Sequence, residues 1–520
     1  MARYTALLFL STALAQSFAP YYANLTWQPP RTLSNWSNLT VETETGTFVG
    51  LFNETYPNVR QFLRVPFAKP PVGDLRWLPP QSLEKSSKRI DSTRYGPACP
   101  QYVPTAETSF NQYAPADLLN NLGESLNQGA VAWASAEDCL SLAIWTPANA
   151  TDISKLPVAL FVTGGHGLTG GIDIPTQVPE EWVARSQEHV VVTINYRVNI
   201  FGNPKSRALD VPSLSLLDVR AAVEWVHANI GAFGGDADNI MLWGQSQGAA
   251  LTHLYTLAFP DDPLAVKFGT ISQPPSVTVD LESTSDPYAD FDTVAKGLGC
   301  NYGDDAEAEL ECMRQVSWVQ IEEFVNRYTE SELDFSLYLP DERYIFSNET
   351  ARYAEGKVAP GPEIRSNAAS EMSSTNRTST AATQKQWLCY SVEQAKLRYE
   401  NGLETYRYLW AGNFSNISPE PWLGAFHTTD LFMIFGTYSK DVGEIPQLEV
   451  DTSAAIQDLF LDFLKEPKSL PSNGWPVYDP TAANKGLVLE LGKEKALRNI
   501  TGEYLDGVCY NSRLPVRLSG

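Results

Sequence analysis

The sequence predicts an α/β fold in which helices cover both faces of a mostly parallel central sheet. Three unbroken apolar runs, LPVALFV (156–162), HVVVTINY (189–196) and NIMLWG (239–244), are typical of strands buried on both faces. Between the last two, SLLDVRAAVEWVHANI (215–230) has apolar residues at helical spacing, with Ser215 as the expected N-cap. Strand, helix and strand in this order favour a parallel sheet.

Three further segments complete this picture. GAFGGDADN (231–239) is expected to be a turn-rich link back to the sheet. The region from about 270 to 350 has helical patterns, many acidic residues and few strand signals, which predicts a helical cap over the sheet. The Ser/Thr/Ala/Asn-rich stretch 366–384 is interpreted as a surface excursion, because helical patterning resumes in 391–402.

Size and charge exclude several classes of protein. The chain has 520 residues with 43% apolar content, enough for a large core. Its formal net charge is −23, which repels nucleic acid and anionic membranes. We interpret this acidity as a solubility feature and expect no nucleic-acid partner.

The first residues, MARYTALLFLSTALAQS, predict export from the cell. Arg3, the short apolar run 6–14 and the small-x-small pattern at 13–15 are typical of a secretory signal peptide, residues 1–15. The alternative is a buried N-terminal strand. No later stretch approaches the roughly 20 apolar residues of a membrane span. We therefore expect a secreted, extracellular protein with a single domain over residues 16–520.

Two residue patterns agree with secretion. Six cysteines suggest three disulfides in an oxidising compartment, and pairing of sequence neighbours among the first four predicts Cys99–Cys139 and Cys300–Cys312, leaving Cys389 and Cys509. None of the cysteine or histidine spacings suggests a metal site. Asn-x-Ser/Thr glycosylation sequons occur at Asn24, Asn35, Asn38, Asn53, Asn149, Asn348, Asn376, Asn413, Asn416 and Asn499.

The motif GQSQG places Ser246 between the predicted strand 239–244 and a plausible helix, AALTHLYTLAF. This is the setting of a nucleophile elbow, a tight strand-to-helix turn that exposes a serine hydroxyl. A Cβ at Gly244 or Gly248 would clash in so crowded a turn. The N-terminus of the following helix adds positive partial charge beneath the nucleophile.

A serine nucleophile needs a base and an orienting acid. In enzymes with such an elbow the chain order is Ser, acid, His, and only His427, in WLGAFHTTDLFMIFG, leaves room for an acid between. His189, His227 and His253 are interpreted as structural residues within strand or helix patterns. Spacing alone does not choose among the many acids between Ser246 and His427.

The chain resembles the type-B carboxylesterase/lipase family, which includes cholinesterases and fungal secreted lipases. Five blocks match the family in order, and they read FLRVPFAKPPVGDLRWLPP (62–80), EDCLSLAIWTP (137–147), INYRVNIFGN (194–203), 216–248 and GAFHTTDLF (424–432). The resemblance implies an α/β-hydrolase fold and pairs Cys139 with Cys99. Two of its segments, 387–402 and 418–436, look closest to fungal secreted members.

The resemblance also implies the acid and the oxyanion hole. EIRSNAASEMSS (363–374) is similar to the family's acid segment, which gives Glu371 this role, with Glu363 as the runner-up because Arg365 and an extra residue depart from the pattern. The family's oxyanion loop corresponds to TGGHG (163–167), so the backbone N–H groups of Gly165, His166 and Gln247 are the implied donors.

The loop FVTGGHGLTGG (161–171) is not a phosphate cradle, because it lacks both Gly-Lys-Ser/Thr and a helix-opening G-x-G-x-x-G. His166 and Gln247 replace smaller residues that the family usually has. The imidazole of His166 is expected near Ser246, where it either fills the acyl pocket or assists the oxyanion or a hydrolytic water.

These observations predict a secreted serine hydrolase that cleaves small-molecule or lipid carboxylic esters through an acyl-enzyme, with no metal and no organic cofactor. The alternatives are a catalytically impaired, cholinesterase-like binding protein and an acyltransferase that uses the same acyl-enzyme. Segment 109–126, within the loop closed by a Cys99–Cys139 bridge, is either a lid over the site or a fixed surface loop.

Overall fold

A computed structural model describes residues 39–101 and 135–511, apart from 276, 285, 332, 372–376 and 439–444. Several sequence expectations fall outside these residues. They are the signal peptide (1–15), the lid segment (109–126) and the sequons at Asn24, Asn35, Asn38 and Asn376.

The described residues form an eleven-stranded sheet in the order β14-β13-β12-β11-β10-β9-β7-β8-β6-β4-β3 and a smaller sheet of order β1-β2-β5. The strands are β1 Thr40–Thr43, β2 Gly46–Val49, β3 Leu51–Phe52, β4 Val59–Pro66, β5 Arg89–Asp91, β6 Ser141–Pro147, β7 Leu156–Val162, β8 Val190–Ile194, β9 Gly235–Gln245, β10 Lys267–Ile271, β11 Glu363–Ala368, β12 Thr405–Trp410, β13 Leu487–Leu491 and β14 Leu497–Thr501.

The large sheet is parallel through its centre, from β8 through β7, β9, β10, β11 and β12 to β13. Its outer pairs β13–β14, β6–β8, β4–β6 and β3–β4 are antiparallel. The predicted mostly parallel sheet is therefore confirmed. β7 shows why its sequence forms a central strand: Leu160 and Val162 pack into one apolar cluster, whereas Phe161 packs into another on the opposite face.

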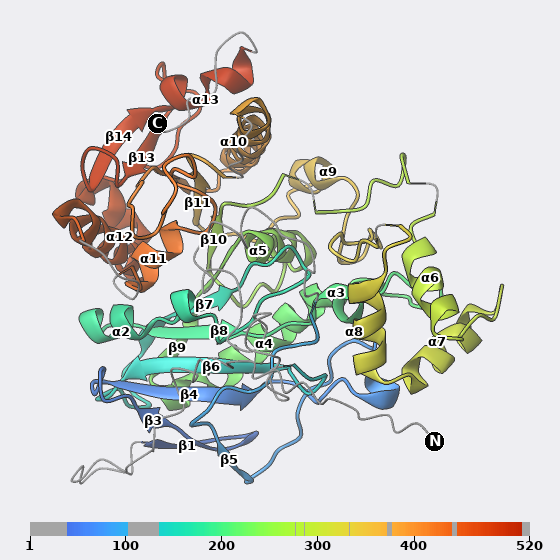
Figure 1. Cartoon of the computed structure of the whole chain (residues 1–520). Coiled ribbons are helices and arrows are strands. Elements are labelled where there is room, and N and C mark those ends of the chain that lie inside the picture. The colour runs from blue at the N-terminus through green and yellow to red at the C-terminus, as the bar shows by residue number, and fades with distance from the viewer. Residues whose placement is uncertain are drawn as a thin grey trace, which may run out of the picture. The chain divides into compact units, whose positions relative to one another are not determined.

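Helices cover both faces of this sheet (Figure 1). α4 and α5 contribute to the cluster that contains Leu160, whereas α2, α11 and α12 contribute to the cluster that contains Phe161. The helices are α2 Glu180–Ser186, α3 Asn199–Gly202, α4 Ser215–Asn229, α5 Gln247–Ala258, α6 Ala289–Gly297, α7 Ala306–Gln315, α8 Trp318–Arg327, α9 Glu349–Ala354, α10 Arg377–Glu400, α11 Asp430–Phe435, α12 Gln447–Lys465 and α13 Gly502–Tyr510.

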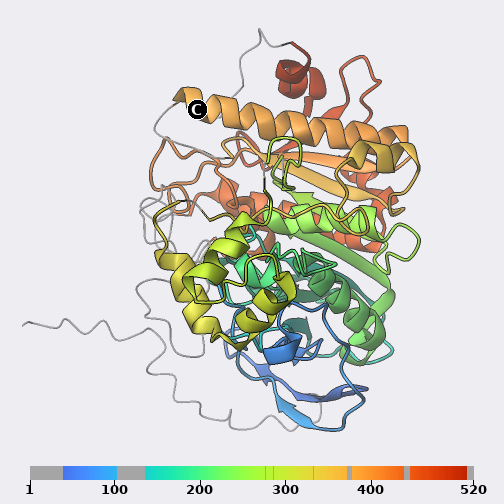
Figure 2. The same ribbon diagram turned by 90° about the vertical axis from the view of Figure 1, so that its right-hand side faces the viewer.

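The expected helical cap corresponds to α6, α7 and α8, which form a group of their own beside α3 (Figure 1). In Figure 2 this yellow-green group lies apart from the long amber helix α10. A separate apolar cluster, which includes Phe291, Leu310 and Ile321 from these helices, packs around Trp77 and Phe201. The cap therefore rests on α3 and its flanking segments rather than directly on the sheet.

Three disulfides are present among the described residues, and they include both neighbour pairs that the sequence predicts. Cys99 pairs with Cys139 and Cys300 with Cys312, while Cys389 of α10 pairs with Cys509 of α13. The third bridge joins helices that lie far apart in sequence and pack against each other.

Ser215 is not the N-cap that the sequence predicts, because α4 begins at Ser215 itself and Leu214 precedes it. The Ser215 hydroxyl instead donates to the carbonyl of Arg197 at 2.7 Å. In the same turn, Asp218 accepts two hydrogen bonds from the guanidinium of Arg197, at 2.7 and 2.8 Å. The first turn of α4 is thus used to hold the segment that follows β8.

Of two segment expectations, one holds in part and the other is wrong. The turn-rich link is present as the 3-10 turn Ile230–Phe233 and the left-handed Gly234, but it is shorter than expected, because β9 begins at Gly235 rather than at 239. The supposed surface excursion begins inside the sheet, because Ser366 to Ala368 belong to the fully buried strand β11, and α10 already starts at Arg377. Small polar residues suit this crowded strand end, where the Ser366 hydroxyl accepts from the N–H of Ser272 at 3.1 Å.

Among the described residues, no helix is both long enough and apolar enough to cross a bilayer.

His189 precedes β8 and links stability to pH. Its imidazole is fully buried against Trp182, with ring centroids 4.3 Å apart, and burial lowers its pKa from 6.5 to about 3. Between these values the unfolded chain binds a proton that the folded chain does not, so the free energy of unfolding falls as pH falls below 6.5.

We therefore expect His189→Gln to flatten the acid side of the stability curve. At neutral pH the variant loses packing against Trp182 and is less stable than the wild type. Between about pH 7 and 4.5 the free energy of unfolding should fall by roughly 2 kcal/mol more in the wild type than in the variant. This figure follows because a pKa change of one unit corresponds to about 1.4 kcal/mol. Urea unfolding at several pH values measures this difference, and parallel curves for the two proteins would contradict it.

Candidate active site

Ser246 lies at the turn between the carboxyl end of β9 and α5. Its backbone is strained, with φ 55° and ψ −123°, a conformation that L residues rarely adopt. The N–H of Ser246 donates to the carbonyl of Ile271 in β10 at 2.9 Å, and the carbonyl of Ser246 accepts from the N–H of Ala250 at 3.0 Å. The strain is thus maintained by the neighbouring strand and by the first turn of α5.

The two glycines of GQSQG are required by close backbone packing. A Cβ built on Gly248 would lie 2.0 Å from the carbonyl oxygen of Val162, and one on Gly244 would lie 2.3 Å from the carbonyl of Gly248. Distances this short do not occur between a Cβ and an atom that is not bonded to it, so the predicted clash at both positions is confirmed. Only glycine lets β7, β9 and α5 approach closely enough to form the turn.

His427 and Glu371 form a buried pair beside this turn. His427 Nδ1 lies 2.7 Å from Glu371 Oε2, and the N–H of His427 donates to the carbonyl of Glu371 at 3.1 Å. Glu371 is fully buried, and its other oxygen accepts from the N–H of Ala368 at 2.6 Å. The carboxylate is thereby aimed at the imidazole, with both oxygens hydrogen-bonded.

The sheet brings these distant residues together. Glu371 follows β11, which neighbours β10. β10 in turn neighbours β9, which ends at Gln245, directly before Ser246. His427 precedes α11, and an isolated bridge between Ser370 and Phe426 sets the two segments side by side. All three residues therefore lie at the carboxyl edge of the parallel strands, where α/β proteins commonly place their sites.

Glu363, the runner-up for the acid, lies at the opposite end of β11. Its carboxylate pairs with Arg365 at 2.8 Å and Arg398 at 3.1 Å and accepts from the Thr270 hydroxyl at 2.6 Å. Burial opposes its ionisation, but the two guanidinium groups outweigh that effect and lower the pKa of Glu363. Glu363 belongs to this ion-pair group, and it is Glu371 that contacts His427.

The glycine-rich loop packs directly over Ser246. A Cβ on Gly164 would lie 2.9 Å from the Cβ of Ser246. The next three residues, Gly165, His166 and Gly167, all have positive φ, at 123°, 60° and 70°. Within the described residues, the N–H groups of Gly165, His166 and Gln247 have no hydrogen-bond acceptor, so they remain available to a ligand.

The two residues that replace smaller ones in this region have different surroundings. The side chain of His166 is exposed to solvent in this structure, so neighbouring residues do not enclose it. The side chain of Gln247 is buried and donates to the carbonyl of Ser336 at 3.4 Å. The additional bulk of Gln247 is thus accommodated against the segment that follows α8.

Several residues around His427 were not singled out from the sequence. The amide nitrogen of Gln245 lies 3.1 Å from His427 Nε2, and Trp387 packs edge-on against the imidazole with centroids 4.9 Å apart. Gln384 Oε1 accepts from the N–H of Glu371 at 2.8 Å, and its Nε2 donates to Ala368 at 2.8 Å. The adjacency of Gln245 to the nucleophile was the available signal, whereas α10 carried none that pointed to the site.

Asp430 is a second buried carboxyl near this group. Its Oδ2 accepts from the Tyr408 hydroxyl at 2.7 Å. Burial and the negative charge of Glu371 raise the pKa of Asp430 to about 6, although the Tyr408 hydrogen bond and His427 act against this rise. Ionisation of Asp430 therefore costs folding free energy, and this cost grows as pH rises through 6.

Comparisons with known proteins agree with the fold and this arrangement. Residues 37–359 match the carboxylesterase family. A chlorogenic acid esterase from Aspergillus niger is 36% identical over 88% of this chain and 92% of its own. Secreted lipase 5 from Gibberella zeae is 32% identical over 85% of this chain and 88% of its own. An acetylcholinesterase from Bungarus fasciatus is 29% identical over 53% of this chain and 43% of its own.

The chain belongs to the carboxylesterase family, whose members have the α/β-hydrolase fold. It is a carboxylic ester hydrolase.

We predict that Asp430→Asn becomes more stable relative to the wild type as pH rises from about 4.5 to 7.5. The variant avoids the cost of ionising a buried carboxyl, which is about 2–3 kcal/mol for a shift of some two pKa units. Thermal unfolding across this range measures the effect. Tyr408→Phe, which removes the hydrogen bond to the carboxylate, should instead steepen the loss of stability with pH. Equal pH profiles for all three proteins would disprove this account of Asp430.

Proposed function

We propose that this protein is a secreted serine ester hydrolase in which Ser246 is the nucleophile, His427 the general base and Glu371 the orienting acid. The observation that carries the proposal is the buried His427–Glu371 pair, with His427 Nε2 3.1 Å from the amide of Gln245, the residue that precedes the strained Ser246. A strained serine at such a turn, with a carboxylate-oriented histidine at the same edge of the sheet, suits nucleophilic acyl transfer.

The tautomer of His427 suits a general base. The amide NH₂ of Gln245 donates, so His427 Nε2 accepts and Nδ1 carries the proton that is directed to Glu371. When an ester binds, His427 Nε2 exchanges its hydrogen bond from Gln245 for one from the Ser246 hydroxyl. Ser246 Oγ then attacks the carbonyl carbon as its proton passes to Nε2. Glu371 then stabilises the imidazolium across the 2.7 Å hydrogen bond.

The N–H groups of Gly165, His166 and Gln247 provide the oxyanion hole in this proposal. Negative charge that develops on the carbonyl oxygen is stabilised by these fixed dipoles, and the loss of one such donor typically costs about 3 kcal/mol of transition-state stabilisation. His427 returns its proton to the departing alcohol, which leaves an acyl-enzyme on Ser246. Water activated by His427 then releases the acid and restores Ser246.

The catalytically impaired binding protein receives less support. Ser246, His427 and Glu371 are all present, and the buried side chain of Gln247 is accommodated against Ser336. An acyltransferase would share every step up to the acyl-enzyme. Partition of that intermediate between water and added methanol separates the two, because a transferase yields mostly methyl ester at low methanol concentration.

Secretion is supported by the three disulfides and by relatives named secreted lipases. Among the described sequons, Asn149, Asn348 and Asn413 are exposed and suit glycan attachment. Asn499 is also exposed, but its amide nitrogen donates to the carbonyl of Gly474 at 2.9 Å. The amide of Asn416 is less suited, because its nitrogen donates to Tyr438 and Glu449, both at 3.0 Å. Asn53 is partly buried and donates to Glu180 at 3.1 Å.

The names of the relatives suggest two substrate classes. One is chlorogenic acid, from the name of the Aspergillus niger esterase, and the other is lipid esters, from the name of the secreted lipase. Rates on chlorogenic acid, on p-nitrophenyl esters of increasing chain length and on emulsified triacylglycerol would rank them. A maximum at short or aromatic acyl groups assigns an esterase, and a rise at the emulsion interface assigns a lipase.

We predict that Ser246→Ala abolishes hydrolysis of short p-nitrophenyl esters, since the hydroxyl that forms the acyl-enzyme is removed. The wild type should also be labelled one-to-one by a fluorophosphonate, and the variant should not. Mass spectrometry of the intact protein and initial rates measure both effects. Equal rates in wild type and variant would refute the proposed nucleophile.

The two candidate acids make a matched pair of substitutions. Glu371→Gln should lower kcat by about 10³–10⁴-fold, because an amide no longer holds His427 in the required tautomer or stabilises its charge. Glu363→Gln should instead lower the free energy of unfolding by about 3–5 kcal/mol and leave kcat of the folded protein near that of the wild type, because it leaves Arg365 and Arg398 undercompensated. The reverse pattern in kinetics and urea unfolding would assign the role to Glu363.

A further inference from the structure

The proposed oxyanion hole depends on the orientation of two peptide groups in the glycine-rich loop. The N–H of Gly165 shares a rigid peptide plane with the carbonyl of Gly164, and the N–H of His166 shares one with the carbonyl of Gly165. Whatever fixes these two carbonyls therefore also fixes the direction of the two donors.

Residues 168–170 fix both carbonyls. The carbonyl of Gly165 accepts from the N–H groups of Leu168 and Thr169, each at 3.0 Å. Gly170 packs against the carbonyl of Gly164 so closely that a Cβ on Gly170 would lie 2.4 Å from this oxygen. The return turn of the loop thus determines how the donor peptides face Ser246.

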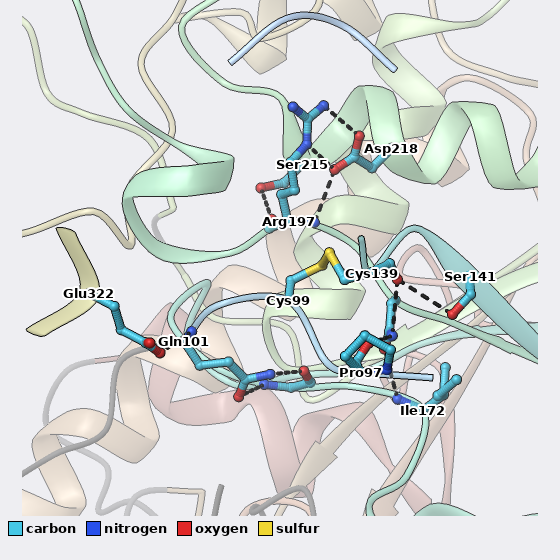
Figure 3. Close-up of a disulfide and its surroundings, with 12 residues drawn as sticks. Pro97, Cys99, Gln101, Cys139, Ser141, Ile172, Arg197, Ser215, Asp218 and Glu322 are labelled. Carbon is cyan, nitrogen blue, oxygen red and sulfur yellow. Dashed lines mark hydrogen bonds and ion pairs between the residues drawn. A yellow bond between two sulfur atoms is a disulfide. The ribbon is translucent and has the colours of Figure 1, made fainter. Parts of the chain in front are cut away.

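Gln101 holds that turn from outside the loop. Its Nε2 donates to the carbonyl of Gly170 at 2.6 Å, and its Oε1 accepts from the N–H of Gly170 at 3.1 Å. One side-chain amide therefore contacts both polar groups of one residue, and it is buried, with 1% of its surface exposed. Figure 3 shows this amide directed at the neighbouring backbone, below the Cys99–Cys139 bridge.

Gln101 is itself fixed from two sides. It lies two residues after Cys99, which is bonded to Cys139, and its N–H donates to Glu322 Oε1 of α8 at 3.1 Å (Figure 3). A second amide acts nearby. Asn195 Oδ1 accepts from the N–H of Ile172 at 3.0 Å, and its Nδ2 donates to the carbonyl of Cys139 at 3.2 Å.

We propose that Gln101 is a positioning residue for the oxyanion hole, which it orients through Gly170 and the carbonyl of Gly164. The inference rests on the proposed function and adds to it a residue that lies outside the catalytic group and outside the loop. It also connects the hole to the cap, since Glu322 of α8 and the Cys99–Cys139 bridge hold the backbone of Gln101 in place.

The chemistry of the side chain makes this role testable. Only a group of this shape with one donor and one acceptor fits both polar atoms of Gly170. A carboxylate at the same position can accept from the N–H but faces the carbonyl with negative charge. A protonated carboxylic acid regains the donor. The Gln101→Glu side chain should therefore hold Gly170 when it is protonated, but not when it is ionised.

The experiment compares Gln101→Leu, Gln101→Glu and a control, Asn229→Leu. Asn229 is a buried amide that donates to the carbonyl of Trp225 at 2.9 Å, within α4 and outside the loop. We expect kcat of Gln101→Leu to fall about 10–100-fold with KM within about 3-fold, and its affinity for a trifluoromethyl ketone, which forms a tetrahedral oxyanion adduct on serine, to fall in parallel. Asn229→Leu should lower the stability of the protein but leave kcat and the affinity for the ketone unchanged.

The pH dependence of Gln101→Glu gives the independent readout, even where the leucine variant does not fold. Its kcat/KM relative to the wild type should rise at least about 5-fold between about pH 8 and 5.5, because the glutamic acid becomes protonated while pH effects common to both proteins cancel in the ratio. A ratio that does not change with pH overturns the proposal. So does a folded Gln101→Leu protein with wild-type kcat and ketone affinity.

Failure of this proposal is distinguishable from failure of the proposed function. Hydrolysis by the wild type that disappears in Ser246→Ala upholds the serine mechanism whatever the Gln101 variants do. Absence of hydrolysis in the wild type overturns both.

Discussion

The close backbone packing around Ser246 is the constraint on which the rest of the site depends. β7, β9 and α5 meet where side chains have no room, as the 2.0 Å approach of a Cβ on Gly248 to Val162 makes clear. This packing holds Ser246 at a positive φ and places Gly164 of the next loop against its Cβ. Because the strain is confined by a well-buried parallel sheet, the turn cannot relax without separating central strands.

The sheet then determines which distant residues reach this turn. β9, β10 and β11 are adjacent and parallel, so their carboxyl ends share one edge, and the segment after β11 supplies Glu371. The order of strands in the sheet, rather than proximity in the sequence, brings Glu371 to the edge that carries Ser246, and the bridge between Ser370 and Phe426 adds the segment of His427. The buried ion pairs lie at other positions, as Glu363 with Arg365 and Asp218 with Arg197 illustrate.

Neutral amides, by contrast, orient the backbone near the site. Gln384 contacts both Glu371 and Ala368, Gln101 contacts both polar groups of Gly170, and Gln245 contacts His427. An amide satisfies a backbone donor and a backbone acceptor together without introducing charge. A charged side chain at these positions would alter the electric field in which the proposed imidazolium and oxyanion would form.

The sequence by itself predicted three central strands, β7, β8 and β9, and the glycine requirement of the Ser246 turn, because apolar runs and close-packed glycines are local signals. It also led to the neighbour pairing of the first four cysteines. It also directed attention to Glu371 and His427, although their roles remain proposals. Only the tertiary structure decided that residues 366–368 form a buried strand, that Ser215 holds Arg197 instead of capping α4, and that His166 faces solvent. The sequence also contained no sign that three further residues lie at the site, namely Gln101, Gln384 and Trp387. Their significance lies in which backbone group or ring they contact, and those contacts are set by the packing of segments far apart in the chain.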